Sequence, residues 1–340
     1  MSIFNKESKI NAFIKLGEYL QNPDHELNEL IIRAKNKNAW FTEEQVKNAL
    51  NAIGKSLNAN DLKSWLDPYN FSNNTKKIGL VLAGNIPLVG FHDILTVLIS
   101  GNVAQIKLSS NDDSLIPTVL KKLVQIEPAF ENSIQFVNRL EGFDAIIATG
   151  SNNTSRYFEY YFSKVPHIIR KNRNSIAILS GTETNNDFMA LGKDIFNYFG
   201  LGCRNVSKLY VPKGYNFIPF FDAIEEYNPI INHQKYNNNY DYNKSIYLVN
   251  KVYHFDNGFL LLTPNESLSS PLSVVYYEEY EDTADLVNTL ESRKEEIQVV
   301  VSQEEIDLTL PVVKFGESQK PQLWDYADGI DTMRFLAELA

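Results

Sequence analysis

The sequence has very little cysteine: Cys203 is the only one in 340 residues. No disulfide can form within the chain, and a single thiol suits a reducing compartment. Long apolar runs are also missing. No stretch approaches the roughly 20 residues that cross a bilayer, and the N-terminus lacks a signal-peptide apolar region. We therefore expect a cytoplasmic protein without membrane insertion.

An excess of positive charge is absent too. The net charge of −10 argues against a nucleic-acid partner, although a local basic pocket for phosphates remains compatible with it. The sequence contains no G-x-G-x-x-G turn, so an ordinary Rossmann phosphate loop is unsupported. The histidines show no metal-ligand spacing, and we expect no metal; they are His25, His92, His167, His233 and His254.

What the sequence does contain is an alternation of short apolar runs and longer periodic segments. Residues 1 to about 67 predict helices, including one that starts at Thr42-x-x-Gln45, and residues 67–77 predict a linker. Strands are then predicted over 78–83, 103–107, 134–137 and 145–148, with helices over 87–100, over 114–126 and from about 153. This βαβ alternation is typical of a parallel, doubly wound sheet.

A second alternating unit follows. It predicts strands over 175–180, 208–211, 273–277 and 297–301, helices over 186–199 and 283–291, and a surface loop in the Asn/Tyr-rich stretch 232–244. The fold class is therefore α/β, with two doubly wound domains and a helical N-terminal segment. We place the first domain, with that segment, in residues 1–172, the second in 173–300, and a C-terminal segment in 301–340.

Polar clusters stand where the predicted strands end, which is where α/β sheets bind ligands. They are Gly84-Asn85-Ile86-Pro87, the run from Gly101 to Ser110, and Ala148-Thr149-Gly150-Ser151, and Gly200-Leu201-Gly202-Cys203 follows later. In this order they resemble the aldehyde dehydrogenase superfamily. From about Lys77 to about Val301 the chain is most similar to the LuxC-type fatty acyl-CoA reductases, which reduce acyl-CoA to aldehyde with NADPH.

The resemblance implies catalytic roles for Cys203 and Asn85. Cys203 would be the nucleophile that takes the acyl group from coenzyme A as a thioester. Asn85 would donate its side-chain amide to the developing oxyanion, with the Cys203 backbone N–H as second donor. From the residue alone, the favoured interpretation of Cys203 is a small buried hydrophobe, and Asn85 can also be the N-cap of a helix that begins near Pro87.

The same resemblance implies a cofactor site in the first domain. Lys107 would contact the adenosine ribose or its phosphate, and Gly150 and Ser151 would meet the pyrophosphate at a helix N-terminus. NAD-preferring relatives carry a glutamate where this chain has Ser110. A serine does not repel a 2′-phosphate, and Ser109, Ser110 and Lys107 together favour NADPH. For Gly150 and Ser151 the alternative is a plain turn with a serine cap.

Two segments depart from the superfamily pattern. Residues 170–174, Arg-Lys-Asn-Arg-Asn, lack the glutamate that activates water in hydrolytic relatives, and their positive charge suits either solvent or cofactor phosphates. Residues 267–271 lack the glutamate that holds the nicotinamide ribose, although Glu266 lies one residue away. Nothing clearly matches the β-hairpin arm through which these enzymes dimerise, so a homo-oligomer is implied by the family alone.

The leading hypothesis is NADPH-dependent reduction of an acyl-CoA to the aldehyde, with the thiol in a cleft between two domains. The substrate is then a small molecule that brings coenzyme A with it. One alternative is an aldehyde dehydrogenase that produces free acid. The other is a non-catalytic relative that binds nucleotide or acyl-CoA.

Overall fold

The computed structural model describes residues 4–72 and 74–339, and the chain divides into two compact units. The first unit takes in the chain up to Asn172 and again from Gln322 onward, and the second runs from Arg173 to Pro321. Residues 301–340, which the sequence sets apart as one C-terminal segment, are thus shared between the units. Leu323, Met333 and Leu336 account for this because they are buried in the core of the first unit.

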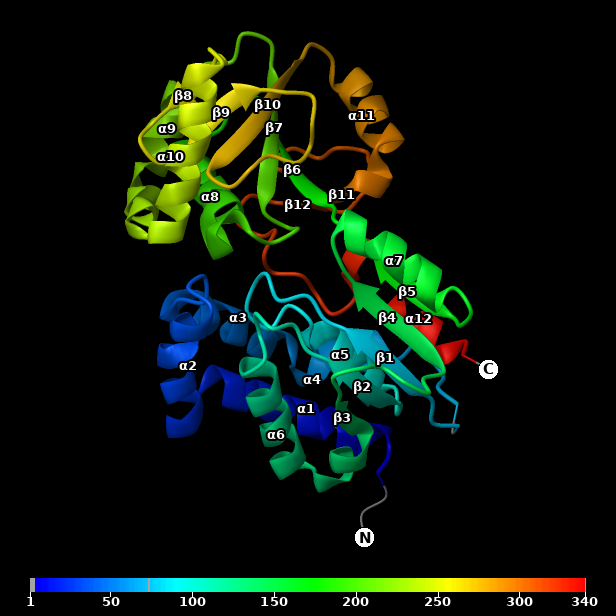
Figure 1. Ribbon diagram of the computed structural model, residues 1–340. Coiled ribbons are helices and arrows are strands. Elements are labelled where there is room, and N and C mark those ends of the chain that lie inside the picture. The colour runs from blue at the N-terminus through cyan, green and yellow to red at the C-terminus, as the bar shows by residue number, and fades with distance from the viewer. Residues whose placement is uncertain (1–3, 73, 340) are drawn as a thin grey trace. The chain divides into compact units, whose positions relative to one another are not determined.

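The first unit is built on a five-stranded parallel sheet in the order β3-β2-β1-β4-β5 (Figure 1). Its strands are β1 (Lys77–Val81), β2 (Val103–Lys107), β3 (Ile134–Phe136), β4 (Ala145–Thr149) and β5 (His167–Arg170). Ile78 and Leu80 of the central strand are fully buried, as expected for a parallel strand covered on both faces. The order reverses at β1, so the crevice beyond the carboxyl ends of β1 and β4 is where such a sheet binds ligands.

Helices cover this sheet and form the N-terminal segment. They are α1 (Lys6–Gln21), α2 (His25–Lys37), α3 (Glu43–Ser56), α4 (Ala59–Leu66), α5 (Phe91–Ile99), α6 (Leu115–Ile126), the 3₁₀ helix η1 (Pro128–Ser133), α7 (Asn152–Phe162), η5 (Ala327–Gly329) and α12 (Thr332–Ala337). Thr42 caps α3 by accepting from the Gln45 N–H, as its spacing predicts. Figure 1 shows α12, in red, beside β4 and β5.

The second unit contains a seven-stranded sheet in the order β12-β11-β6-β7-β10-β9-β8. All neighbours are parallel except β8, which is antiparallel to β9. The strands are β6 (Asn174–Ile178), β7 (Val206–Pro212), β8 (Phe255–Asp256), β9 (Leu261–Pro264), β10 (Val274–Tyr280), β11 (Ile297–Ser302) and β12 (Val312–Val313). The helices are α8 (Asn185–Phe196), η2 (Asn197–Gly200), α9 (Ile218–Ala223), η3 (Ile224–Asn232), α10 (Gln234–Val249), α11 (Thr283–Ser292) and η4 (Lys294–Glu296).

The predicted surface loop over 232–244 is wrong, because this stretch lies in η3 and α10. The His233 side chain caps α10 by accepting from the Tyr236 N–H. Tyr236, Tyr240 and Asn243 recur at helical spacing and are buried, and Tyr240 packs with Leu261. The apolar stripe was hidden because tyrosine supplies it within a polar, low-complexity composition.

The helix predicted over 87–100 begins only at Phe91. Gly90 is its N-cap, and no side chain caps it. Leu88 has a φ of 59°, a left-handed conformation that ends any regular helix. The alternative that Asn85 is the N-cap of this helix is therefore wrong. Asn85 lies instead in an exposed position on the loop between β1 and α5.

No helix in the part of the chain that the structure describes combines the length and the apolar character needed to cross a membrane.

Candidate active site

Cys203 lies on a tight turn between α8 and β7. Tyr198, Phe199 and Gly200 have φ values of 53°, 58° and 78°, so three successive residues are left-handed. Such a conformation costs about 1–2 kcal/mol for each residue that carries a side chain, and glycine avoids the cost. The Cys203 side chain that follows is exposed. The alternative of a small buried hydrophobe is therefore wrong, and the turn presents the thiol at the surface of its unit.

Asn205 fixes this turn against the end of α8. Its side-chain oxygen accepts from the Gly202 N–H at 2.8 Å. Its amide donates to the carbonyls of Asp194, Ile195 and Asn197 at 3.0, 3.3 and 2.8 Å. The side chain is buried, so these bonds satisfy groups that water cannot reach. Cys203 is thereby held between two points of attachment, its neighbour Gly202 and its own carbonyl.

The second attachment comes from Ser175, whose hydroxyl donates to the Cys203 carbonyl at 2.9 Å. The end of α8 is fixed in turn by Asp194, a buried carboxylate that accepts from the backbone N–H groups of Gly316 and Ser318. Burial raises the pKa of Asp194, and these N–H donors oppose the shift. Hydrogen bonds therefore fix the turn and the helix end before it, and a nucleophile must be held in this way to be positioned.

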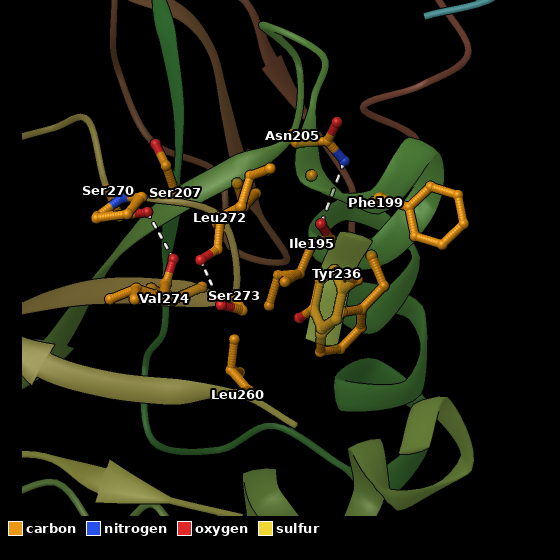
Figure 2. Close-up of a pocket in the computed structure, with 15 residues that line it drawn as sticks. Ile195, Phe199, Asn205, Ser207, Tyr236, Leu260, Ser270, Leu272, Ser273 and Val274 are labelled. Atoms are coloured by element: carbon orange, nitrogen blue, oxygen red, sulfur yellow. Dashed lines mark hydrogen bonds between the residues drawn. The ribbon is translucent and has the colours of Figure 1, made fainter. Parts of the chain in front are cut away.

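A cavity of about 40 Å³ lies behind the Cys203 turn, within the second unit. Figure 2 shows Ile195, Leu260, Leu272 and Tyr236 around the same space. The full lining is Ile195, Phe196, Phe199, Gly200, Asn205, Val206, Ser207, Tyr236, Leu260, Ser270, Pro271, Leu272, Ser273, Val274 and Val275. It contains no charged side chain and includes both sides of the turn, at Gly200 and Asn205.

The first unit gathers most of the other predicted residues at one edge of its sheet. Asn85 follows β1, Lys107 ends β2, and Gly150 and Ser151 follow β4. These strands are parallel neighbours, so their carboxyl ends lie side by side at the ligand-binding edge. Asn85, Lys107 and Ser151 are exposed there. Ser151 is also the N-cap of α7 and accepts from the Thr154 N–H, as the alternative interpretation expected.

Two contacts join the loops that carry Asn85 and Ser110. A Cβ at Gly84 would overlap the Ser109 hydroxyl, so only glycine allows this close approach. The buried carboxylate of Asp112 accepts from the Leu88 N–H at 2.8 Å. Ser109 is half-buried, whereas Ser110 is exposed. The Asn85 loop and the proposed phosphate-binding loop therefore form one packed substructure.

Glu266 belongs to the second unit, like Cys203, and is exposed. The Arg293 guanidinium donates to the Glu266 carbonyl at 3.0 Å. Of the aligned segment 267–271, Leu268 is buried and its carbonyl accepts from the Ser207 hydroxyl. The structure therefore places this segment beside the start of β7, the strand that follows the Cys203 turn in the sequence.

The basic segment 170–174 is largely engaged by the protein itself. Arg170 is buried and donates to both carboxylate oxygens of Asp93 at 2.6 Å. Lys171 pairs with Glu159 at 2.8 Å on the surface. The idea that all these cations meet cofactor phosphates fails for Arg170, because an ion pair already neutralises its charge inside the first unit.

Sequence reasoning missed Asn205, Asp112 and Arg170 as residues that shape the site. Asn205 stands two positions after the cysteine, and that adjacency was the available signal. Asp112 and Arg170 offered none, because a charged residue in a loop or at a strand end is usually exposed. Their burial depends on contacts with Leu88 and Asp93, 24 and 77 positions away.

The comparison with protein families decides the assignment. Residues 18–217 match the acyl-CoA reductase (LuxC) family. This chain belongs to that family. The matched region of this acyl-CoA reductase family member contains Cys203, Asn85 and Lys107, and it ends before Glu266. The comparison with curated sequences returned no match.

Solved structures with a similar fold are aldehyde dehydrogenases. KauB from Pseudomonas aeruginosa has a TM-score of 0.65 at 13% identity, covering 92% of this chain and 77% of its own. Lactaldehyde dehydrogenase from Escherichia coli has a TM-score of 0.63 at 13% identity, and the match covers 89% of this chain and 75% of that enzyme. GapN from Methanocaldococcus jannaschii is a glyceraldehyde-3-phosphate dehydrogenase whose structure was solved in complex with NADP. It has a TM-score of 0.64 at 12% identity, and the match covers 95% of this chain and 83% of that enzyme. The predicted aldehyde dehydrogenase-like α/β fold with a helical N-terminal segment is confirmed.

Proposed function

We propose that the protein reduces an acyl-CoA to the aldehyde, with NADPH as reductant and a thioester on Cys203 as intermediate. The observation that carries this proposal is the exposed Cys203 thiol on a turn that Asn205 and Ser175 hold from both sides. A rigidly held, accessible thiol in a chain of the acyl-CoA reductase family is suited to nucleophilic catalysis.

In the first half-reaction the Cys203 thiolate attacks the carbonyl carbon of the acyl-CoA. A new carbon–sulfur bond forms, the bond to coenzyme A breaks, and the departing thiolate takes a proton from water. The Cys203 N–H and the Asn85 amide are the proposed donors to the oxyanion. Their role is to stabilise charge that exists only in the transition state.

In the second half-reaction the acyl carbon is reduced and the bond to Cys203 breaks, which releases the aldehyde and restores the thiolate. Bound NADPH supplies the hydride. One acyl-CoA, one NADPH and one proton thus give one aldehyde, one coenzyme A and one NADP⁺. The protein's own part in this step is to hold the thioester and to keep water from attacking it.

The residues at the edge of the first sheet fit a nicotinamide dinucleotide phosphate. Lys107 and Ser110 are exposed at the end of β2 and on the loop that follows it. A cation and hydroxyls there suit a 2′-phosphate, and no carboxylate stands at position 110 to repel it. The proposed cofactor contacts are Lys107, Ser109, Ser110, Gly150 and Ser151, with Glu266 at the nicotinamide ribose.

Hydrolysis of the thioester needs a base that activates water. Residues 170–174 supply no carboxylate, and Arg170 there is buried in its pair with Asp93. This favours release of the acyl group as aldehyde over release as free acid. It also distinguishes the proposal from an aldehyde dehydrogenase that produces acid.

The testing experiment is intact-mass measurement of the purified protein with acyl-CoA of several chain lengths, first without and then with NADPH. We expect one acyl group on the wild type, none on Cys203→Ala, and its discharge as aldehyde on adding NADPH. Absence of an adduct at every chain length would overturn the proposal and favour a non-catalytic binder. Acid from an aldehyde and NADP⁺ without coenzyme A would favour the dehydrogenase.

A further inference from the structure

The strand that follows Cys203 contains a β-bulge at Ser207. Two successive residues of β6, 175 and 176, pair with residues 206 and 208 of β7, so Ser207 is inserted between two pairs of the ladder. Bulges are rare between parallel strands, and they often re-aim a side chain next to an active site. Ser207 is half-buried, and its hydroxyl contacts two carbonyls from different parts of the second unit.

This hydroxyl connects the Cys203 turn to the segment that carries Glu266. It donates to the Leu268 carbonyl at 2.7 Å and lies 3.3 Å from the Ser175 carbonyl, so the bond to Leu268 is the stronger one. The Ser175 hydroxyl donates in turn to the Cys203 carbonyl at 2.9 Å. A continuous run of contacts therefore joins the backbone of the proposed nucleophile to the backbone beside Glu266.

The backbone of residues 265–270 is held at further points. The Leu268 side chain is 1% exposed and packs in a core cluster that includes residues of α11. The Arg293 guanidinium donates to the Glu266 carbonyl at 3.0 Å, and the Glu296 carboxylate accepts from the same guanidinium at 3.0 and 3.1 Å. Glu266 itself is exposed. The segment thus combines a fixed backbone with an acidic residue at the surface.

Hydride transfer to a thioester on Cys203 requires such a fixed arrangement. Reacting atoms must approach to about 3–3.5 Å, and a misplacement of about 1 Å can lower the rate about a hundredfold. Glu266 is the proposed contact of the nicotinamide ribose, so its position relative to Cys203 affects this approach. Ser207 lies four residues after Cys203, and it bonds to the backbone two residues after Glu266.

We propose that Ser207 is a positioning residue for hydride transfer, which acts by holding the Glu266 segment in place relative to Cys203. This inference rests on the proposed function, from which Cys203 and Glu266 take their roles. It separates the two half-reactions. Acylation uses the Cys203 turn, which Asn205 and Ser175 hold through bonds of their own, whereas reduction also depends on Glu266.

The first measurement compares Ser207→Ala with the wild type. Acylation of Cys203 by acyl-CoA, followed by intact mass, should stay within about twofold. The Kd for NADPH should rise roughly fivefold, the effect of one lost hydrogen bond, and discharge of the thioester by NADPH should slow by at least about tenfold. Ser207→Thr keeps the hydroxyl and should restore both. Equal slowing of the two half-reactions would overturn the inference, because the whole turn would then be affected.

Ser302→Ala is the matched control. Ser302 is a buried serine on β11, its hydroxyl donates to the Glu304 carbonyl at 3.1 Å, and it lies toward the opposite end of the sheet from Ser207. Its substitution should lower stability to urea about as much as Ser207→Ala, yet leave the Kd for NADPH and the discharge rate unchanged. An equal loss of NADPH affinity in Ser302→Ala would reduce the effect to general stability and contradict the positioning role.

Hydrogen exchange of the protein without cofactor reports on the positioning itself. The N–H groups of Asn265 and Ser267 are hydrogen-bonded within the second unit. In Ser207→Ala they should exchange roughly fivefold faster, because the segment opens more often. The bonded N–H of Gly202, in the Cys203 turn, should exchange at its wild-type rate. Wild-type exchange rates at positions 265 and 267 would show that Ser207 does not hold the segment.

Glu266→Gln tests whether Ser207 acts through Glu266. This substitution should itself raise the Kd for NADPH, and adding Ser207→Ala to it should change the Kd no further, because the positioned carboxylate is gone. Additive effects, or a wild-type Kd for Glu266→Gln, would overturn the inference and leave the reductase proposal intact. Non-additive effects in a protein that forms no acyl adduct would support the inference and overturn the reductase alone.

Discussion

The carboxylate of Asp112 accepts a hydrogen bond from the backbone N–H of Leu88 at 2.8 Å. This bond joins the loop that carries Asn85 to the loop that carries Ser109 and Ser110. Asp112 is 2% exposed, and among the described residues its other carboxylate oxygen has no partner. A half-satisfied buried carboxylate costs stability, and the bond to Leu88 offsets part of that cost while it holds the two loops together.

The stability of the protein should depend on the ionisation of Asp112. Burial raises its pKa from 3.8 to about 6. The folded state therefore binds a proton between about pH 4 and pH 6 that the unfolded chain does not, and the contribution of Asp112 to stability falls as pH rises through 6. Asp112→Asn keeps an acceptor for Leu88 but cannot ionise. Its free energy of unfolding should rise relative to wild type by about 3 kcal/mol between pH 4 and pH 7.

Urea unfolding of both proteins at several pH values measures this difference. Glu131→Gln, at an exposed position of the same unit, controls for a general effect of charge. A difference between Asp112→Asn and wild type that stays constant from pH 4 to pH 7 would contradict the assignment.

Asn85→Ala should slow the transfer of the acyl group to Cys203. Loss of one oxyanion donor typically costs about 3 kcal/mol of barrier, or about a hundredfold in rate. Since Asn85 is exposed and caps no helix, the free energy of unfolding should change by less than about 1 kcal/mol. Rapid-quench intact-mass kinetics with acyl-CoA give the rate. An unchanged acylation rate would remove Asn85 from the proposed machinery.

Ser110→Glu should reverse the cofactor preference. A carboxylate at this exposed position repels a 2′-phosphate and accepts from ribose hydroxyls, so the Kd for NADPH should rise by at least about tenfold, or 1.4 kcal/mol. The Kd for NADH should fall. Nucleotide fluorescence titrations give both constants, and Asn111→Glu provides the same charge one residue further along. Equal effects of the two substitutions would show that only net charge matters.

Asn205 should be indispensable to the Cys203 turn because of its donors as well as its size. Asn205→Ala leaves three carbonyls and the Gly202 N–H without their partner, and should lower the free energy of unfolding by about 3 kcal/mol. Asn205→Asp is almost isosteric but faces a carboxylate toward three carbonyl oxygens. It should destabilise at least as much as alanine, as urea unfolding measures. A near-neutral Asn205→Asp would mean that the amide donors contribute little.

Local sequence patterns predicted much of the fold. The apolar run near Ile78 became the central strand β1, and the periodic segment from Ser114 became α6. They were predictable because burial on both faces of a parallel strand, or on one face of a helix, leaves a periodic trace in the chain. The α10 helix was not predicted, because its buried stripe consists of Tyr236, Tyr240 and Asn243 within an Asn-rich run.

The candidate site likewise has a part that the sequence predicted and a part that it did not. Asn85, Lys107 and Gly150 could be placed at one sheet edge because each follows or ends a recognisable strand, and parallel strands share that edge. The exposure of Cys203 could not be predicted, because one cysteine is compatible with a core position as well as a surface one.

By itself, the sequence determined the βαβ alternation of the two units, the resemblance to LuxC-type reductases and the residues that carry it. Only the tertiary structure decided which polar groups are buried and bonded, that the chain from Gln322 onward returns to the first unit, and that a cavity lies behind the Cys203 turn. The physical reason is range. Periodicity and capping depend on residues a few positions apart, whereas the bonds of Asp112 and Arg170 and the walls of the cavity join segments that only folding brings together.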